Sequence, residues 1–141
     1  MRTAVPLRGS VIGRNTCDLP SDDALRAALA VDDLGGPQRE FAEWDCKWGG
    51  DDGRDLRLLF QRDEGYGHEG TRVSVPGHVA YERGDAWGDG CLVDVVAAEG
   101  ASPEGDGPVT GLLRVHLAGE GGEGTLCEDA VAVARSAAAA L

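Results

Sequence analysis

Cys91-Leu92-Val93-Asp94-Val95-Val96-Ala97 decides the fold, together with a second stretch of the same kind that runs from Val109 to Ala118. Apolar residues alternate with other residues in both stretches, as they do in strands that bury one face. The segment between them, 100–108, contains the glycines and prolines that are typical of a loop. We therefore predict that the two stretches form an antiparallel hairpin.

Residue alternation divides this hairpin into two faces. We expect one face to contact helices, and its residues are Cys91, Val93, Val95, Leu113, Val115 and Leu117. The opposite face then carries Leu92, Asp94, Leu112, Arg114 and His116. Binding partners use mixed apolar and charged surfaces of this kind. We predict a binding face there; cover by a further helix or loop is the alternative.

A short helix is predicted near the start of the chain. Ser21 is a good N-cap, and Asp22 and Asp23 place negative charge in the first turn, where it suits the helix dipole. The residues on its apolar face are Leu25, Ala28 and Leu29. We expect Gly35-Gly36-Pro37 to end this helix.

A second helix is predicted at the end of the chain, from about Leu126 to Leu141. Thr125 and Glu128 have the spacing of a capping box, in which two backbone donors are satisfied reciprocally. The apolar stripe of this helix is Leu126, Ala130, Val133, Ala134, Ala137 and Leu141.

The middle of the chain predicts further strands. Residues 41–48 and 55–61 flank the turn-forming segment 49–53, which indicates a hairpin. A short strand from Val73 to Tyr81 is expected to be broken at Pro76-Gly77. The order helix, hairpin, strand, hairpin, helix predicts an α+β fold. We expect an antiparallel sheet of about four to five strands, with the N-terminal and C-terminal helices packed on one face.

Four cysteines, Cys17, Cys46, Cys91 and Cys127, lie far apart and include no Cys-x-x-Cys pair. This arrangement predicts two structural disulfides and therefore a place outside the reducing cytosol. The alternatives are buried inert thiols or a metal site, although zinc sites usually take ligands from close pairs. Residues 1–16 are expected to be a flexible arm or linker, and residues 17–141 a single disulfide-braced domain.

Topology suggests how the cysteines pair, although four cysteines allow three connectivities. Cys91 begins one strand of the last hairpin and Cys127 follows the end of the other, and these positions are neighbours in an antiparallel pair. Cys17 is then left for Cys46. Closing loops of about thirty to forty residues stabilises a fold by roughly 3.5–4 kcal/mol each in the chain-entropy model.

Composition limits the partners. The chain has 141 residues and a formal net charge of −12, which repels phosphate backbones and anionic membranes. We therefore expect no nucleic acid, whereas an unknown protein, peptide or envelope ligand remains open. No stretch is long enough to cross a bilayer. The opening, Met1 to Ile12, lacks the apolar run of a signal peptide, so we expect an export leader or anchor to lie outside this sequence.

Four short motifs resemble a known group of proteins. They are Cys17-Asp18-Leu19, Cys46-Lys47-Trp48, Val75-Pro76-Gly77-His78-Val79-Ala80-Tyr81 followed by Cys91-Leu92-Val93, and Cys127-Glu128-Asp129-Ala130. The pattern resembles actinobacterial secreted lipoproteins of unknown function, and related extracytoplasmic sensor domains of receptor kinases look similar. One lysine against twelve arginines agrees with a high-GC genome. The resemblance implies a disulfide-braced domain at or released from the cell surface, and it supplies no catalytic residues.

Catalytic and metal-binding motifs are absent from the sequence. There is no Gly-x-Ser-x-Gly elbow and no phosphate-binding loop, and His68, His78 and His116 lack ligand spacing. Segments 51–55 and 85–90 contain several aspartates, for which turn chemistry is a simpler explanation than weak calcium binding. We expect no cofactor and no enzyme activity. Trp87, in a Gly/Asp loop, is a candidate contact residue, whereas Trp48 shares a face with Cys46 and Trp44 and is expected to cover the first disulfide.

The expected function is a non-enzymatic extracytoplasmic binding or sensing module. The candidate binding face comprises Asp94, Arg114, His116 and Trp87. The second hypothesis is an acidic inhibitor or immunity-type protein that binds a basic enzyme. A third is a small hydrolase whose residues come together from distant loops. Neither the ligand nor the oligomeric state follows from the sequence.

Overall fold

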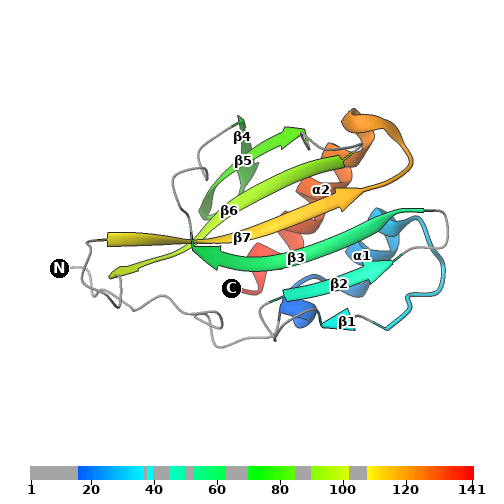
Figure 1. Cartoon of the computed structure of the whole chain (residues 1–141), viewed down its shortest axis with the longest axis horizontal. Coiled ribbons are helices and arrows are strands. Elements are labelled where there is room, and N and C mark those ends of the chain that lie inside the picture. The colour runs from blue at the N-terminus through cyan, green and yellow to red at the C-terminus, as the bar shows by residue number, and fades with distance from the viewer. Residues whose placement is uncertain are drawn as a thin grey trace.

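The computed structural model describes residues 16–36, 38–39, 45–49, 53–62, 70–84, 90–101 and 108–141. Within these ranges, seven antiparallel strands form one sheet, and two α-helices lie against one of its faces (Figure 1). The predicted α+β class and the placement of both helices on one face are confirmed.

The elements follow one another along the chain as helix, strands and helix. They are η1 (Thr16–Asp18), α1 (Asp22–Leu29), β1 (Gln38–Arg39), β2 (Asp45–Gly49), β3 (Asp55–Arg62), β4 (Thr71–Val75), β5 (His78–Gly84), β6 (Gly90–Ala101), β7 (Pro108–Ala118) and α2 (Gly122–Ala139). The order across the sheet is β1-β2-β3-β7-β6-β5-β4, so the last strand of the chain lies in the middle, between β3 and β6.

The predicted hairpin of β6 and β7 forms the centre of this sheet. Cys91 pairs with Leu117 and Asp94 with Arg114, and a register shift interrupts the pairing between Val96 and Ala98. On its other side β7 pairs with β3 along the whole of that strand. Pairing with each other and with the flanking strands β3 and β5 therefore holds both central strands in a fixed register.

The core lies between the sheet and the helices, as the alternation predicted. Its strand residues include Cys46, Trp48, Leu56, Leu58, Phe60, Val93, Val95, Leu113, Val115 and Leu117, each at most 3 % exposed. Leu25, Ala28 and Leu29 of α1 and Leu126, Ala130, Val133, Ala134 and Ala137 of α2 complete the same cluster. Cys46 and Trp48 share the core face as expected, and Trp44 lies outside the described residues.

The expected strand count was too low. Six strands have five residues or more, and β1 adds a seventh of two residues. The segment from Val73 to Tyr81 was expected to be one broken strand, but it is the hairpin of β4 and β5. Gly77 adopts a φ of 80° between them, so Pro76-Gly77 reverses the chain instead of only interrupting it.

The first helix begins as predicted and ends earlier than predicted. The Ser21 hydroxyl accepts a hydrogen bond from the backbone N–H of Ala24 at 3.2 Å, which is the N-cap contact. The helix ends at Leu29, because Ala30 adopts a left-handed φ of 57° and its N–H bonds back to the last turn. Gly35-Gly36-Pro37 is therefore not the end of the helix.

The second helix begins earlier than predicted, and its expected capping box is wrong. Gly121 is the N-cap and no side chain caps it. Thr125 already lies inside the helix, because the helix starts at Gly122, so Thr125 is not at the N-cap position. The helix ends at Ala139, two residues before the predicted end.

Both predicted disulfides are present. Cys17 is bonded to Cys46 and Cys91 to Cys127. The first bridge ties η1 to β2, and the second ties the start of β6 to α2.

In the part of the chain that the structure describes, no helix is both long and apolar enough to cross a membrane. Of the expected arm, 1–15 lie outside the described residues, and Thr16 is buried in η1.

Candidate binding face

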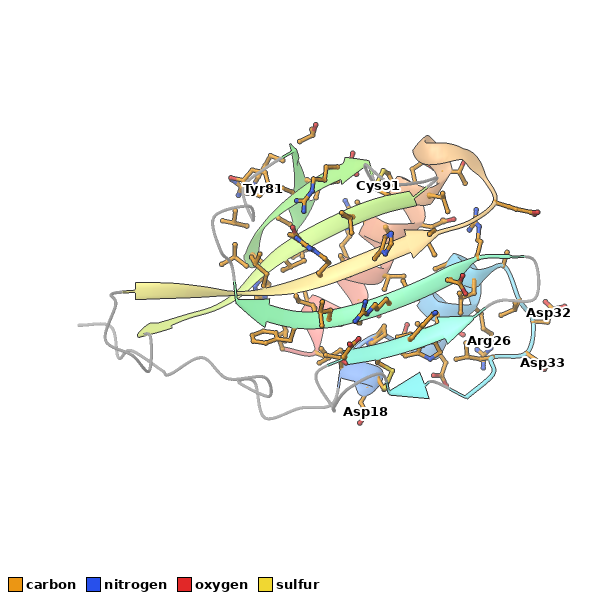
Figure 2. All side chains as sticks on the ribbon, viewed as in Figure 1. Asp18, Arg26, Asp32, Asp33, Tyr81 and Cys91 are labelled. Atoms are coloured by element: carbon orange, nitrogen blue, oxygen red, sulfur yellow. A yellow bond between two sulfur atoms is a disulfide. The ribbon has the colours of Figure 1, made fainter. Side chains whose placement is uncertain are left out.

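The sheet has a second face, which points away from the helices and toward the viewer in Figure 2. We call it the open face, and strand register defines its members. Its described side chains are Asp45, Lys47, Asp55, Arg57, Leu59, Arg72, Ser74, Val79, Tyr81, Arg83, Leu92, Asp94, Val96, Leu112, Arg114 and His116. These residues come from six strands, so only the folded sheet brings them together.

Asp94 is the buried centre of the open face. Its carboxylate is 0 % exposed and accepts hydrogen bonds from Arg114 Nε at 2.7 Å and Arg114 Nη2 at 2.9 Å. Arg83 Nη1 donates a third bond at 3.0 Å. One carboxylate is thus shared by two guanidinium groups, each with 22 % of its side chain exposed. The group Arg83–Asp94–Arg114 carries a formal charge of +1.

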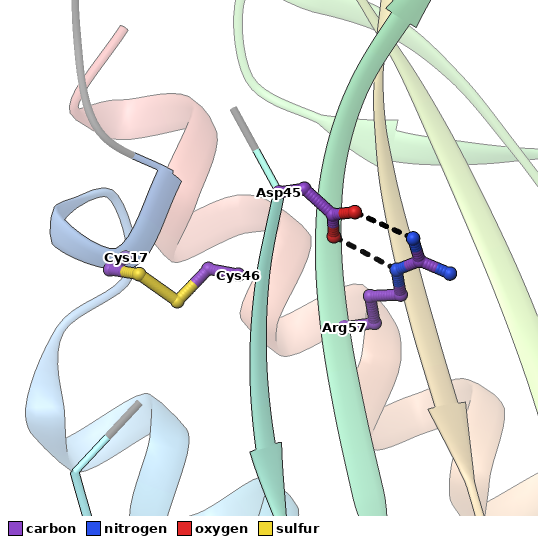
Figure 3. The surroundings of a disulfide bond; sticks show 4 residues. All are labelled: Cys17, Asp45, Cys46 and Arg57. Atoms are coloured by element: carbon purple, nitrogen blue, oxygen red, sulfur yellow. Dashed lines mark hydrogen bonds and ion pairs between the residues drawn. A yellow bond between two sulfur atoms is a disulfide. The ribbon is translucent and has the colours of Figure 1, made fainter. Parts of the chain in front are cut away.

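A second ion pair lies on β2 and β3. Asp45, also 0 % exposed, accepts hydrogen bonds from Arg57 Nε at 2.9 Å and Arg57 Nη2 at 2.6 Å (Figure 3). The Arg57 side chain is 38 % exposed. The carboxylates of both pairs are therefore buried below the arginines that they bind, so each pair presents its cation to the exterior.

The open face differs in charge from the rest of the chain. Five cationic side chains, those of Lys47, Arg57, Arg72, Arg83 and Arg114, stand against the carboxylates of Asp45, Asp55 and Asp94, so its described residues sum to +2. The other described charged side chains lie on or beside the helices and on the helix side of β5. Nine carboxylates and three arginines there sum to −6. Figure 2 labels three of these carboxylates, those of Asp18, Asp32 and Asp33.

Apolar side chains lie between these cations. Leu59 is directly opposite Arg114, and Leu92 is directly opposite both Arg83 and His116. Both leucines are half-buried. The Arg72 guanidinium lies 5.9 Å from the centre of the Tyr81 ring, a cation–π distance. Leu112 is only 1 % exposed, so this end of the open face is covered.

The structure brings three of the four predicted binding residues together. Asp94, Arg114 and His116 share the open face, and Trp87 lies outside the described residues. Asp94 does not point to the exterior as expected of a contact residue, because it is fully buried beneath the arginines. The histidines separate: His78 lies on the helix side, where its Nδ1–H donates to the Val96 carbonyl at 2.9 Å. His68 is outside the described residues.

Sequence reasoning missed Arg83, Asp45 and Arg57 as members of the face. The sequence pattern could have identified Arg57, because this residue lies between the buried Leu56 and Leu58 on a predicted strand. Arg83 required the knowledge that β5 continues to Gly84, three residues past Tyr81, where the predicted strand ended.

A groove lies on the helix side of the molecule, between β5 and α2. It has a volume of about 590 Å³ and is lined by Glu82, Gly124, Cys127, Glu128, Val131 and Arg135. The Glu82 carboxylate and the sulfurs of Cys91 and Cys127 lie within 4.8 Å of one another. Because both sulfurs are bonded to each other, they offer no thiolate to a metal ion.

No protein-family model, curated protein or solved structure matches this chain.

Proposed function

We propose that this chain is a non-enzymatic extracytoplasmic binding or sensing module of a bacterial cell-surface or secreted protein, and that its ligand docks on the open face. The observation that carries the proposal is the pair of buried carboxylates, Asp94 and Asp45, that hold three arginines at the surface of the sheet.

Stability alone does not require such a network. A buried carboxylate loses its hydration, and replacing a whole buried ion network by apolar side chains of similar volume is often neutral or stabilising. Fixed guanidinium groups do serve recognition, because ordering them in advance lowers the entropic cost of binding. Arginine and tyrosine are also the residues that binding surfaces favour. The open face contains both, with half-buried leucines between them.

The disulfides support the cellular location. Both bridges connect separate elements of the fold, η1 to β2 and β6 to α2, as structural disulfides do. Such bridges persist in oxidising compartments and are rare in the cytosol.

The acidic side of the molecule favours a second candidate function, an inhibitor or immunity-type protein that binds a basic enzyme. The charge of −6 on and beside the helices would steer a cationic partner to that side. The two functions therefore place the ligand on opposite sides of the sheet.

Selection of ligands from a random peptide display library tests which side binds. The bait is the oxidised protein, and the selected peptides are then measured against Leu92→Ser and Leu34→Ser. Leu34 is the matched control, because it is also a half-buried leucine but packs on the helix side. We expect Leu92→Ser to weaken binding at least about fivefold, the loss expected when one apolar contact is removed. Leu34→Ser should leave binding within about twofold.

Two results would reject the open face as the binding surface. One is a library that yields no enriched peptide. The other is a set of peptides that lose affinity with Leu34→Ser and keep it with Leu92→Ser.

A further inference from the structure

We infer that Glu82 is a charge gate on the Cys91–Cys127 disulfide, by which we mean that it slows thiol–disulfide exchange with anionic thiols and favours cationic ones. The site of this covalent modification lies in the groove between β5 and α2. The class of reagent that it admits best is a small thiol that carries an amino group. This chemistry takes place on the helix side and does not depend on what the open face binds.

Glu82 lies beside both sulfurs of this bridge. Its carboxylate and the Sγ atoms of Cys91 and Cys127 are all within 4.8 Å of one another, and the three residues come from β5, β6 and α2. The Glu82 side chain is half-buried, and among the described residues no side chain donates a hydrogen bond to it or pairs with its charge. The carboxylate therefore places an uncompensated negative charge next to the disulfide.

The groove gives a small thiol access to one of the two sulfurs. Cys127 lines the groove, which has a volume of about 590 Å³, and is half-buried, whereas Cys91 is 0 % exposed. A thiolate therefore attacks the Cys127 sulfur, the S–S bond breaks, and Cys91 leaves as a thiolate. A second thiolate then releases Cys127 and forms the disulfide of the reagent. Two thiols are oxidised, and each cysteine takes up one proton.

Glu82 acts on the transition state of this exchange. The negative charge of the attacking thiolate is then shared among three sulfurs, and two of them lie within 4.8 Å of the Glu82 carboxylate. Like charges about 5 Å apart repel each other enough to slow a reaction severalfold even in water, and more where the pair is partly buried. A carboxylate on the reagent adds to this repulsion, whereas an ammonium group on the reagent is attracted to Glu82.

The cation of the groove lies away from the disulfide. Arg135 is eight residues after Cys127, which is about 12 Å along the helix. Its Nε donates to the Ser74 carbonyl of β4 at 2.8 Å, so its charge is directed to the edge of the sheet. The end of the groove that contains the disulfide is therefore anionic.

The second disulfide provides an internal reference. Each bridge joins one half-buried cysteine, Cys127 or Cys17, to a partner that is 0 % exposed. An exposed acidic residue follows the half-buried cysteine in both, Glu128 in one bridge and Asp18 in the other. Among the described residues, however, no histidine or carboxylate lies within 4.8 Å of both sulfurs of the Cys17 bridge. Glu82 is thus the feature that distinguishes the two, and it protects the bridge that ties α2 to the central strand β6.

The experiment measures both bridges in one protein. The oxidised protein is exposed to mercaptoacetate, mercaptoethanol or cysteamine, which carry a carboxylate, no further charge and an amino group. Free thiols are alkylated at intervals, and peptide mapping gives the initial rate of opening of each bridge. The rate for Cys91–Cys127 divided by the rate for Cys17–Cys46 cancels the intrinsic reactivity of each reagent. This ratio should rise at least about threefold from mercaptoacetate to cysteamine.

Glu82→Gln removes the charge and keeps the shape of the side chain. Its rate ratio should vary by less than about twofold among the three thiols, and mercaptoacetate should open Cys91–Cys127 at least about threefold faster than in the parent protein. Asp33→Asn is the control, because it removes one charge from an exposed carboxylate that Figure 2 shows far from Cys91. Asp33→Asn should behave as the parent protein does, and circular dichroism checks that both variants are folded.

Two results would overturn the charge gate. One is a rate ratio that stays within about twofold for all three thiols in the parent protein. The other is an equal dependence on thiol charge in the parent protein, Glu82→Gln and Asp33→Asn. The first result requires no variant, so the gate can be rejected even if Glu82→Gln fails to fold.

Discussion

Asp45 and Cys46 are neighbours on β2, and their side chains leave the strand on opposite sides. Figure 3 shows Cys46 bonded to Cys17 on the helix side and Asp45 bound to Arg57 on the open face. The strand period of two residues produces this division. The disulfide that ties η1 to β2 therefore also anchors the strand that carries one of the two buried carboxylates of the open face.

The two disulfides should contribute comparably to stability. Their sequence separations are 29 and 36 residues, so the chain-entropy model gives each about 3.5–4 kcal/mol. We expect Cys17→Ala/Cys46→Ala and Cys91→Ala/Cys127→Ala each to lower the free energy of unfolding in urea by a similar amount. Intact mass with and without reduction, followed by peptide mapping, verifies the pairing first. A variant as stable as the parent protein would show that its bridge does not brace the fold.

Arg54 is expected to be the most important single ion for stability. It is 8 % exposed and links three segments: its Nε donates to the Glu120 carbonyl at 2.8 Å, and its Nη1 donates to the Ala28 carbonyl at 2.7 Å and to Asp129 at 2.8 Å. Arg54→Met leaves these acceptors without their donor and should cost about 2–4 kcal/mol.

The matched control for Arg54 is Arg26→Met. Arg26 also pairs with an aspartate, but the side chains of Arg26 and Asp23 are 41 % and 96 % exposed. Exposed pairs of this kind contribute less than about 1 kcal/mol. Urea unfolding of both variants measures the difference, and equal losses would contradict the role assigned to Arg54.

Gly119 should not tolerate a side chain. Its φ is 120°, and an added Cβ would collide with the Gly53 carbonyl and lie 2.8 Å from Arg54 Cα. We expect Gly119→Ala to destabilise the protein by at least about 2 kcal/mol. Gly124→Ala in α2 is the control, because nothing lies within 4 Å of its added Cβ. It should be neutral or stabilise by up to about 1 kcal/mol. In thermal unfolding, the midpoint temperature of Gly119→Ala should therefore fall, whereas that of Gly124→Ala should stay unchanged or rise.

The two helix starts give a test of the capping assignments. Ser21 caps α1 through Ala24, and its own N–H donates to the Ser136 hydroxyl of α2 at 2.8 Å. Ser21→Ala should cost about 0.5–2 kcal/mol. Thr125→Ala should cost less than about 0.5 kcal/mol, because Thr125 is not an N-cap. The reverse order, measured by urea unfolding, would restore the capping box that the sequence suggested.

Short-range patterns predicted much of the fold. Alternation identified both faces of β6 and β7, and the antiparallel pairing of those strands led to the correct disulfides. The predictions failed where the decisive contact is distant in sequence or depends on backbone conformation. Ala30 ends α1 by adopting a left-handed conformation that alanine rarely takes, and nothing in its neighbours signals it.

The composition of the open face was predicted only in part for the same reason. Alternation placed Asp94 and Arg114 on one face, but Arg83 reaches Asp94 from β5, and the sequence does not state that β5 pairs with β6. The sequence therefore did not indicate that Asp94 is buried and bound by two arginines. The buried Arg54 was missed altogether, because its partners lie 26, 66 and 75 residues away along the chain.

Chemical-shift mapping during ligand binding would show whether the ligand docks on the open face. The methyl groups of the oxidised protein are observed by NMR while a peptide enriched from the display library is added. We expect the largest shifts at Leu59, Leu92 and Val96 on the open face. Shifts confined to Val31, Leu34 and Val131 on the helix side would contradict it, and would place the ligand on the acidic side of the molecule.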